Sequence, residues 1–197
     1  MLKIALTGGI ATGKSHVLEQ FRRRGVPCLD ADMLAHGVEA AGTEATQAIA
    51  ARFGASVLAA DGSVDRSTLG PIVFADATAR KELEAIVHPA VYRAIAAGLR
   101  AFELTGNPRL AIVDIPLLFE TGRAMDFDLV IATVCRPDIQ LARLVARGMS
   151  EEDAQRRLSA QLSAAEKAKR ANHVIETSGS YEETEAQVER VLRQLMA

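Results

Sequence analysis

The sequence has no tryptophan, and it has only two cysteines, two tyrosines and six phenylalanines among its 197 residues. With aromatic residues at 4%, few side chains are available as platforms on which bases or sugars stack. A charge excess is missing too, because 23 Lys and Arg residues face 25 Asp and Glu residues, for a net charge of -2. Dedicated nucleic-acid-binding proteins usually carry a basic excess, so we expect no nucleic-acid partner.

Long apolar runs are absent as well. No window approaches the roughly 18 apolar residues that a membrane span needs, and the first apolar run stops at Gly8 without a signal-peptide cleavage site. Cys28 and Cys135 stand alone, without the C-x-x-C spacing of a zinc site. Isolated cysteines are typical of small buried residues in a reducing compartment. We therefore expect a cytoplasmic protein that has no membrane partner.

What is present fits one globular domain. Hydrophobic residues make up 49% of the chain and charged residues 24%, close to the globular average. Five short apolar runs alternate with helical patterns, which predicts a parallel sheet covered by helices on both faces. The expected fold class is therefore α/β, with five strands. The predicted strands are residues 2–7, 26–29, 110–115, 129–134 and 173–177.

Helical patterns fill most of the chain between the second and third predicted strands. This stretch, residues 36–108, exceeds a simple crossover and predicts an inserted helical subdomain. Within it, His88-Pro89 predicts a break between two helices, because a proline disfavours helix at the residue before it. Near the C-terminus, Ser150 and Ser180 each precede an acidic residue by three positions and predict the beginnings of two helices.

A glycine-rich motif indicates phosphate binding. It matches G-x-x-x-x-G-K-[ST] and lies between an apolar run and an amphipathic helix, as a P-loop requires. The glycines let successive backbone N–H groups point into one concavity, and the following helix adds the positive end of its dipole. In this pattern the lysine contacts the β- and γ-phosphates of a nucleotide, and the serine hydroxyl can ligate Mg²⁺. The residues predicted to bind the nucleotide are Gly8, Gly9, Ile10, Ala11, Thr12, Gly13, Lys14, Ser15 and His16.

A missing tetrapeptide and three aspartates indicate which class of P-loop protein this is. A GTPase would carry the tetrapeptide N-K-x-D, which the sequence lacks, whereas a small kinase needs a base for the attacking hydroxyl. Asp30 and Asp32 follow the second predicted strand, at the edge where open α/β sheets bind ligands. We expect one of the two to be the base and the other a helix cap or scaffold. Asp114 ends the apolar run that starts at Leu110, and it either contacts the metal or forms a turn.

Basic residues gather between Arg136 and Arg170. Eight basic residues face five acidic ones there, so this segment is +3 in a chain of -2. An ordinary solvated helical face carries such charges too. Beside a P-loop, however, residues 144–170 are predicted as a lid that clamps phosphates and excludes water, with Arg143 as the first candidate clamp. The core is then expected to comprise residues 1–35, 109–143 and 171–197.

Several short motifs make the sequence resemble the dephospho-CoA kinase family from end to end. Their combination at these intervals is more specific than the P-loop alone. The matching stretches are Leu6-Thr7-Gly8-Gly9-Ile10, Asp30-Ala31-Asp32, Phe53-Gly54, His88-Pro89, Pro116-Leu117-Leu118-Phe119-Glu120 and Ala171-Asn172-His173-Val174-Ile175.

The resemblance implies a kinase that uses ATP and Mg²⁺ to phosphorylate the ribose 3′-hydroxyl of dephospho-CoA. It also implies that the insertion binds the CoA moiety. Asp32 would be the catalytic base, and Arg143 would be the arginine on the lid side. Thr7, His88 and Glu120 would lie near the acceptor, although His88 equally fits a helix cap or a packed core histidine. We further expect a monomer or a weak oligomer.

Four positions depart from the family patterns G-G-I-G-S-G-K-S-T and V-I-x-N-x-G. Ala11 needs a backbone conformation that a Cβ tolerates, and Thr12 stands in place of serine. His16 replaces a hydroxyl that often touches a nucleotide phosphate, which predicts an altered ATP affinity. Residues 174–179 lack the asparagine, so an adenine contact from that side chain is not expected. Two alternatives remain: another P-loop kinase of a small metabolite hydroxyl or nucleotide, and a non-catalytic ATP-binding regulator.

Overall fold

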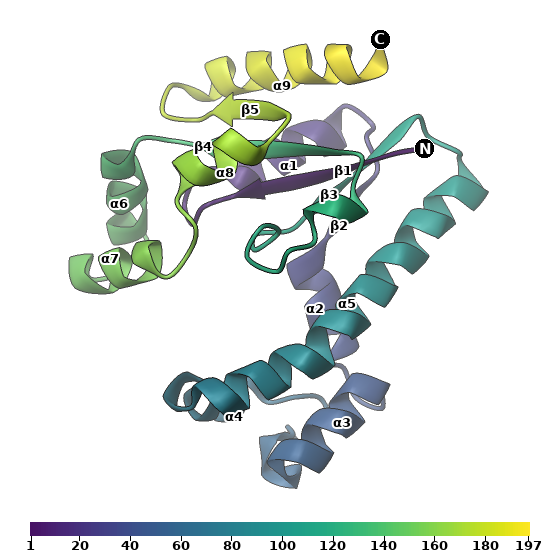
Figure 1. The fold of residues 1–197 in the computed structure, drawn as a ribbon, viewed down its shortest axis with the longest axis vertical. Coiled ribbons are helices and arrows are strands. Elements are labelled where there is room, and N and C mark those ends of the chain that lie inside the picture. The colour runs from purple at the N-terminus through teal and green to yellow at the C-terminus, as the bar shows by residue number, and fades with distance from the viewer. The chain divides into compact units, whose positions relative to one another are not determined.

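The chain forms two compact units in the computed structural model, which describes residues 1–197. The first unit comprises residues 1–29 and 102–197, and the second comprises residues 30–101. The second unit overlaps the insertion expected at 36–108, but it begins earlier, at the first aspartate of Asp30-Ala31-Asp32. Figure 1 labels the elements along the chain.

A five-stranded sheet in the order β2-β3-β1-β4-β5 supports the first unit. β1 pairs in parallel with β3 and β4, and β4 pairs in parallel with β5. Each strand begins and ends within two residues of its predicted position, and the predicted α/β class with a parallel sheet is confirmed. The strands are β1 (Leu2–Gly8), β2 (Cys28–Asp30), β3 (Leu110–Asp114), β4 (Leu129–Val134) and β5 (His173–Glu176).

Helices make up most of the remaining regular structure. The first unit holds α1 and α6 to α9, and the second holds α2 to α4 and most of α5. None of them combines the length and the apolar character of a membrane-spanning helix. The helices are α1 (Lys14–Arg23), α2 (Ala31–Val38), α3 (Glu44–Phe53), α4 (Arg66–Ala75), α5 (Ala77–Thr105), α6 (Pro137–Ala146), α7 (Glu151–Ser159), α8 (Ala164–Arg170) and α9 (Tyr181–Met196).

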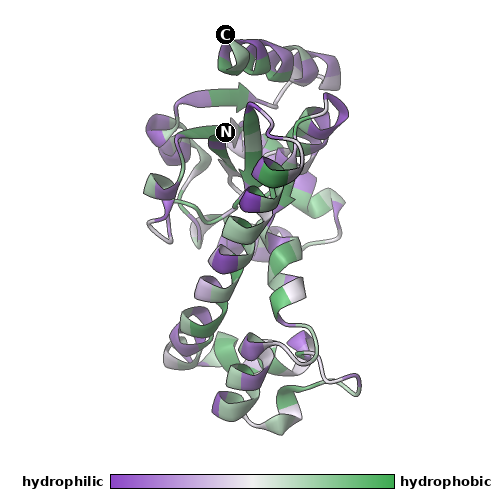
Figure 2. Cartoon of the chain, turned by 90° about the vertical axis from the view of Figure 1, so that its right-hand side faces the viewer, coloured by the Kyte–Doolittle hydropathy of each residue, from purple (hydrophilic) through white to green (hydrophobic).

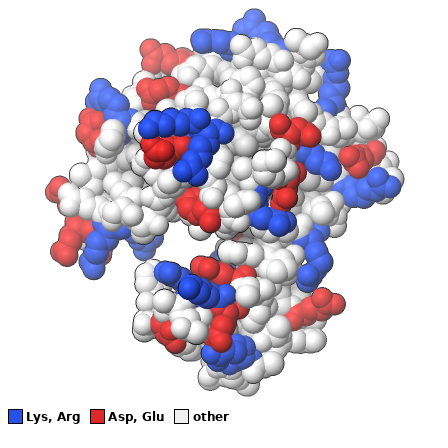
Figure 3. Space-filling model, viewed as in Figure 1, with Lys and Arg blue, Asp and Glu red and all other residues white.

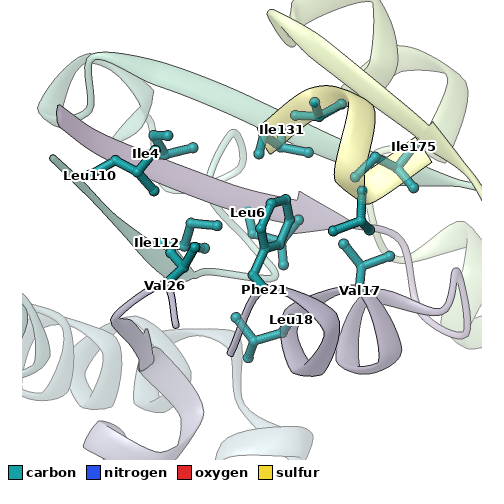
Figure 4. Packing of buried hydrophobic residues seen from close by; sticks show 12 residues of the cluster. Ile4, Leu6, Val17, Leu18, Phe21, Val26, Leu110, Ile112, Ile131 and Ile175 are labelled. Atoms are coloured by element: carbon teal, nitrogen blue, oxygen red, sulfur yellow. The ribbon is translucent and has the colours of Figure 1, made fainter. Parts of the chain in front are cut away.

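One face of the sheet forms the main hydrophobic core. Because side chains alternate along a strand, Ile4 and Leu6 of β1 lie on the same face, where Ile112 of β3 and Ile131 of β4 join them (Figure 4). α1 and α9 cover this face, and Phe21 of α1 is fully buried in the cluster. This packing fixes the direction in which α1 leaves the end of β1.

The predicted lid contributes to the packing of the sheet. α8 packs against β4 and β1, and Figure 1 shows it on the side of the sheet away from α1. α6 and α7 pack against each other around Leu144 and Ala154, and Ala11 of the P-loop joins this cluster. The last third of residues 144–170 is therefore a core element of the first unit.

α5 contradicts the helix break predicted at His88-Pro89. These residues lie inside a single helix of 29 residues. A proline within a helix removes one backbone donor and crowds the carbonyl four residues earlier. Apolar packing on both sides outweighs this cost, because Ile86 and Val87 pack against the core of the second unit and Val91 is buried. His88 is therefore not a helix cap, and its half-buried ring makes no hydrogen bond.

Both predicted helix starts near the C-terminus are confirmed. The Ser150 hydroxyl accepts a hydrogen bond from the Asp153 backbone N–H at 3.1 Å, and Ser180 forms a reciprocal capping box with Glu183. α9 then directs Val188 into the core. Figure 2 shows how hydrophobic and hydrophilic residues are distributed. The strands are predominantly green, and the C-terminal helix alternates purple and green.

The two cysteines are unpaired and shielded from solvent. Cys135 is buried and Cys28 is partly buried. Burial raises the pKa of the Cys28 thiol to about 12 and also raises the pKa of Cys135. Both are therefore protonated packing residues rather than reactive thiols, as their isolation in the sequence predicts.

Candidate active site

The P-loop connects β1 to α1, as predicted. Gly13 caps α1 in the left-handed conformation, with φ at 79°. Ala11 is also left-handed, with φ at 60°, in a region that costs a residue with a Cβ atom about 1 kcal/mol. The Ala11 methyl is buried against Leu144 and Ala154, and this apolar contact offsets part of the cost.

Polar residues lie at or within one position of the carboxyl ends of three strands next to the P-loop. Asp114, Thr133 and Thr177 each stand two positions after a core isoleucine of β3, β4 or β5. Alternation along a strand therefore directs them to the face that α1 covers. All three are at least 96% buried. The core of this face thus changes from apolar to polar at the carboxyl edge, where the P-loop lies.

Lys14 forms an ion pair with the Asp114 carboxylate. The two side chains are only 14% and 5% exposed, so water screens the pair weakly. The structure therefore brings together the predicted phosphate-binding lysine and the predicted metal-binding carboxylate, which are 100 positions apart in the chain.

Threonine hydroxyls fix the shape of the loop. The Thr12 hydroxyl donates to the Gly9 carbonyl at 2.8 Å and lies 2.7 Å from the Thr133 hydroxyl oxygen. The Thr177 hydroxyl donates to the Thr12 carbonyl at 2.7 Å. Gly8 is the residue that this arrangement demands, because a Cβ there would lie 2.1 Å from the Thr133 hydroxyl oxygen. The threonine at 177, where the family pattern has asparagine, thus binds the P-loop backbone.

Arg143 lies on α6 and contacts the same loop. Its guanidinium donates to the Ala11 carbonyl at 3.2 Å and to the Thr177 carbonyl at 2.6 Å. It also donates to the Thr177 hydroxyl at 3.2 Å. Arg143 therefore connects α6, the P-loop and the end of β5, and its contact with a phosphoryl group stays a prediction.

Two glutamines that the sequence analysis did not identify hold the peptide groups of Ile10. The Gln140 side chain donates to the Ile10 carbonyl at 2.7 Å, and the Gln161 side-chain oxygen accepts from the Ile10 N–H at 3.2 Å. Gly9 leaves room for this contact, because a Cβ there would lie 3.1 Å from the Gln140 amide nitrogen and would push it away by a few tenths of an ångström. No local pattern predicts these contacts, since the glutamines are at least 130 positions away from Ile10.

The two aspartates of Asp30-Ala31-Asp32 have different local roles. Asp30 is the N-cap of α2, and its carboxylate accepts from the Asp32 N–H at 2.9 Å and the Met33 N–H at 3.1 Å. The Asp32 side chain is exposed and makes no hydrogen bond or ion pair. The cap predicted for one of the pair is therefore Asp30, and the carboxylate of Asp32 is free.

Thr7 and Glu120, both predicted near the acceptor, already have partners within the first unit. The Thr7 hydroxyl donates to the Pro116 carbonyl at 3.2 Å. Glu120 forms an ion pair with Lys167 at 2.9 Å and accepts from the Leu162 N–H at 3.0 Å. Their polar groups therefore hold the segment after β3 in place.

His16 follows the P-loop serine on α1. Its ring packs against that of Tyr181 in a tilted arrangement, with a centroid distance of 4.6 Å, and its Nε2 is buried without a hydrogen-bond partner. A carboxylate oxygen of Glu185 is 3.8 Å away, beyond hydrogen-bond distance. At the position where the family pattern has a threonine hydroxyl, this chain therefore has an aromatic ring that contacts α9.

The residues beside the P-loop fit a magnesium ion. Mg²⁺ prefers oxygen ligands and is usually held by one or two carboxylates together with substrate phosphates and water. Ser15 has an exposed hydroxyl without a partner, and Asp114 supplies a buried carboxylate beside Lys14. The chain contains no cluster of three or more His, Cys, Asp or Glu side chains that would bind a metal without a substrate. This donor set suits a metal that arrives with phosphates.

The arginine-rich segment forms no uniform basic surface. Positive and negative side chains intermingle on the face that Figure 3 shows. Within the segment, Arg136 pairs with Asp138, Arg156 with Asp153, and Lys169 with Glu166. Those exposed pairs form an ordinary solvated helical face, one of the two predictions for this segment, whereas Arg143 and Lys167 point into the unit.

Comparisons with known proteins agree with this geometry. The family model described as dephospho-CoA kinase matches residues 2–183. The dephospho-CoA kinase of Geobacillus kaustophilus is 45% identical over 194 residues, which cover 98% of this chain and 96% of the relative. That of Anaeromyxobacter dehalogenans is 45% identical over 196 residues, which cover 99% and 92% of the two chains.

Solved structures extend the similarity to the whole fold. The crystal structure of TT1252 from Thermus thermophilus is 34% identical, with a TM-score of 0.83, over 100% of this chain and 98% of that one. Dephospho-CoA kinase from Campylobacter jejuni is 28% identical, with a TM-score of 0.74, over 98% and 96%. The resemblance seen in the short motifs therefore extends over the full length of the chain.

Proposed function

Because the chain belongs to the dephospho-CoA kinase family, we propose that it transfers the γ-phosphoryl group of ATP to the ribose 3′-hydroxyl of dephospho-CoA. The products are coenzyme A and ADP. The observation that carries the proposal is the P-loop with its buried Lys14–Asp114 pair, in a chain that matches the family from end to end. A P-loop alone supports many phosphate chemistries, and the family supplies the acceptor.

The proposed step is an in-line displacement. The 3′-hydroxyl oxygen forms a bond to the γ-phosphorus, and the bond from that phosphorus to the β–γ bridging oxygen breaks, so that ADP leaves. The hydroxyl proton passes to the Asp32 carboxylate, which makes no hydrogen bond or ion pair within the protein and is free to accept it. Lys14 and the backbone N–H groups of the P-loop stabilise the charge on the phosphate oxygens.

Ser15 and Asp114 are proposed to hold Mg²⁺ together with the phosphates of ATP. When bound, this ion neutralises phosphate charge and orients the β and γ groups. Asp114 pairs with Lys14 in the protein alone, so we expect the lysine to exchange this partner for phosphate oxygens when nucleotide binds. Arg143 is proposed to add a further cation at the phosphoryl group.

The helical unit of residues 30–101 is proposed to bind the acceptor. Asp32 and His88 make no hydrogen bond within the protein, so both are free to bind a ligand. The polar groups of Thr7 and Glu120 are already engaged, and we expect them to shape the site more than to bind the acceptor.

A steady-state assay with ATP, Mg²⁺ and dephospho-CoA tests the proposal. Chromatography should show coenzyme A and ADP in equal amounts, and phosphorus NMR should place the new phosphate on the 3′-oxygen. Shikimate, gluconate and nucleoside monophosphates serve as competing acceptors. Turnover on one of them without formation of coenzyme A would identify another kinase, and nucleotide binding without any turnover would indicate a regulator.

A further inference from the structure

Lys167 is the only lysine or arginine of the chain with a fully buried side chain. Withdrawing an ammonium group from water is expensive unless partners replace the lost hydration. Such a residue is retained where its contacts matter, and the proposed transfer step does not use it. Its position on α8 also lies outside every motif that points to the family.

Two oxygen atoms satisfy the buried ammonium group. Lys167 Nζ donates to the Pro116 carbonyl at 2.6 Å and lies 2.9 Å from Glu120 Oε1. The same Oε1 accepts from the Leu162 N–H at 3.0 Å. Lys167 therefore connects α8 with the segment that follows β3, and Glu120 connects that segment with the residues preceding α8.

The segment held in this way begins in the proposed phosphoryl-transfer site. Asp114 pairs with Lys14, and Pro116, two positions later, accepts from both Lys167 and Thr7. Thr7 directly precedes the first glycine of the P-loop. In the short stretch from Asp114 to Pro116, the first residue thus pairs with Lys14 of the P-loop, and the third accepts a hydrogen bond from the buried Lys167.

The charge of Lys167 also acts on this site. Burial lowers the pKa of Lys167, the ion pair with Glu120 opposes this effect, and the positive charge of Lys14 lowers the pKa further. The two ammonium groups are therefore close enough to interact. Even so, Lys167 faces Pro116 and Glu120 rather than open solvent, so it acts through other groups and not by touching a substrate.

We propose that Lys167 is a positioning residue for phosphoryl transfer, which holds the Asp114 carboxylate at the P-loop by binding the Pro116 carbonyl and Glu120. This inference rests on the proposed function, since it assigns Asp114 a role in that reaction. When Lys14 turns to the phosphates, its ion pair with Asp114 breaks. The anchored backbone then keeps the carboxylate in place for the metal.

The test compares three variants with the wild-type protein. Lys167→Met removes the charge at nearly constant volume, and Lys167→Met combined with Glu120→Gln also removes the carboxylate left without its cation. Lys169→Met is the matched control, because Lys169 lies two positions away on α8 and pairs only with Glu166 at the surface. Each protein is measured for kcat, KM for ATP, thermal midpoint and hydrogen exchange of residues 112–122.

Both Lys167 variants should lower kcat about 100-fold, the scale expected when a reacting group is misplaced by about 1 Å, while KM for ATP changes less than threefold. Exchange of residues 112–122 should accelerate in both, and Lys169→Met should match the wild type. The double variant should melt close to the wild type, because no unpaired charge remains buried. A double variant that regains wild-type kcat along with its stability would reduce Lys167 to a folding role and overturn the inference.

An unchanged kcat in folded Lys167→Met would overturn it as well. Failure of the proposed function has a different signature, because the wild-type protein itself would then form no coenzyme A. In that case the exchange measurement still decides whether Lys167 holds the segment after Asp114. Unaltered exchange in residues 112–122 contradicts the anchoring contact whatever the acceptor is.

Discussion

Asp30 and Asp32 lie two positions apart, and their local contacts separate two roles that the sequence leaves open. Asp30 uses its carboxylate to cap α2, so its negative charge is directed at backbone N–H groups. The same turn leaves Asp32 on the first turn of the helix with an exposed, unpartnered side chain. A base must be able to reorient toward the proton it accepts. The cap holds the Asp30 carboxylate against the helix N-terminus, whereas no hydrogen bond restrains that of Asp32, so Asp32 is the one of the two that we propose as the base.

We therefore expect Asp32→Asn to lower kcat by about 100-fold or more, because proton transfer by a positioned base contributes on this scale. The amide keeps the shape of the side chain but cannot accept the proton. ATP affinity, measured by titration calorimetry, should stay within threefold, since a base acts on the chemical step.

The matched control is Asp30→Asn, because asparagine caps helices nearly as well as aspartate. Its thermal midpoint and kcat should stay near those of the wild type. Asp32→Asn with an unchanged kcat, or Asp30→Asn with the larger loss of kcat, would transfer the base role away from Asp32.

Lys14 is expected to serve both the fold and the reaction. Lys14→Met removes the cation at the phosphates, and we expect kcat to fall by about 1,000-fold, the upper range for losing one stabilising donor. It also breaks the weakly exposed ion pair between Lys14 and Asp114, which should lower the free energy of unfolding by roughly 3 kcal/mol. Urea denaturation and the coupled assay measure the two effects separately. A fully stable variant would show that the pair is worth little in the folded protein, and an active one would remove Lys14 from the mechanism.

At the scale of elements, the period-two alternation of the strands places much of the site. Asp114 could be assigned to the carboxyl edge from the sequence, because the apolar run before it reads as a strand. The same rule puts Thr133 and Thr177 on the face of the P-loop, but nothing in their local sequence marks them as functional. Their role appears only when β4 and β5 are known to be neighbours on one side of β1.

Gly8 illustrates how tightly these elements meet. Gly8→Ala would place a Cβ 2.1 Å from the Thr133 hydroxyl oxygen and 2.6 Å from that of Thr12. Both hydroxyls are buried and bonded to each other, so they cannot move without breaking the network. We expect a loss of about 2 kcal/mol in stability, as for other overpacked cores, together with loss of ATP binding.

Gly25→Ala is a useful comparison for that experiment, because a Cβ at Gly25 meets no atom within 4 Å. Its φ of 76° still imposes a backbone cost, so it should lose about 1 kcal/mol of stability and keep ATP binding. Calorimetric titration of both variants with ATP separates the two cases. Normal ATP binding by Gly8→Ala would show that the threonine network can reshape around a methyl group.

The limits of local pattern are clearest in α5 and α8. Pro89 predicts a break by its own stereochemistry, but tertiary packing of apolar residues on both sides keeps α5 continuous. Lys167 reads as one more cation of a basic surface, and only the packing of α8 against β1 and β4 buries it. In both cases a long-range contact overrides the local preference, and such contacts are not visible in a single sequence.

At the scale of the whole molecule, the net charge of -2 is an average over segments of opposite charge, one of which is the basic segment near the P-loop. The basic segment of residues 136–170 divides into exposed ion pairs and two inward cations, Arg143 and Lys167. The cations that contact the P-loop and the segment after β3 are therefore this inward minority, which charge counting along the chain cannot distinguish from the surface majority.

The scarcity of aromatic side chains leads to a prediction about how the molecule binds ATP. With no tryptophan and 4% aromatic residues, stacking on adenine contributes little, and the phosphates should supply most of the binding free energy. A ligand present at 100 times its Kd stabilises a protein by about 2.7 kcal/mol. For a chain of this size, that corresponds to a rise in Tm of roughly 5–10 °C.

ATP with Mg²⁺ should produce this rise in a thermal scan, and adenosine at the same concentration should shift Tm by less than about 1 °C. Lys14→Met should abolish the ATP response, because the phosphates lose their cation, while an equal shift with adenosine would show that the base rather than the P-loop holds the nucleotide.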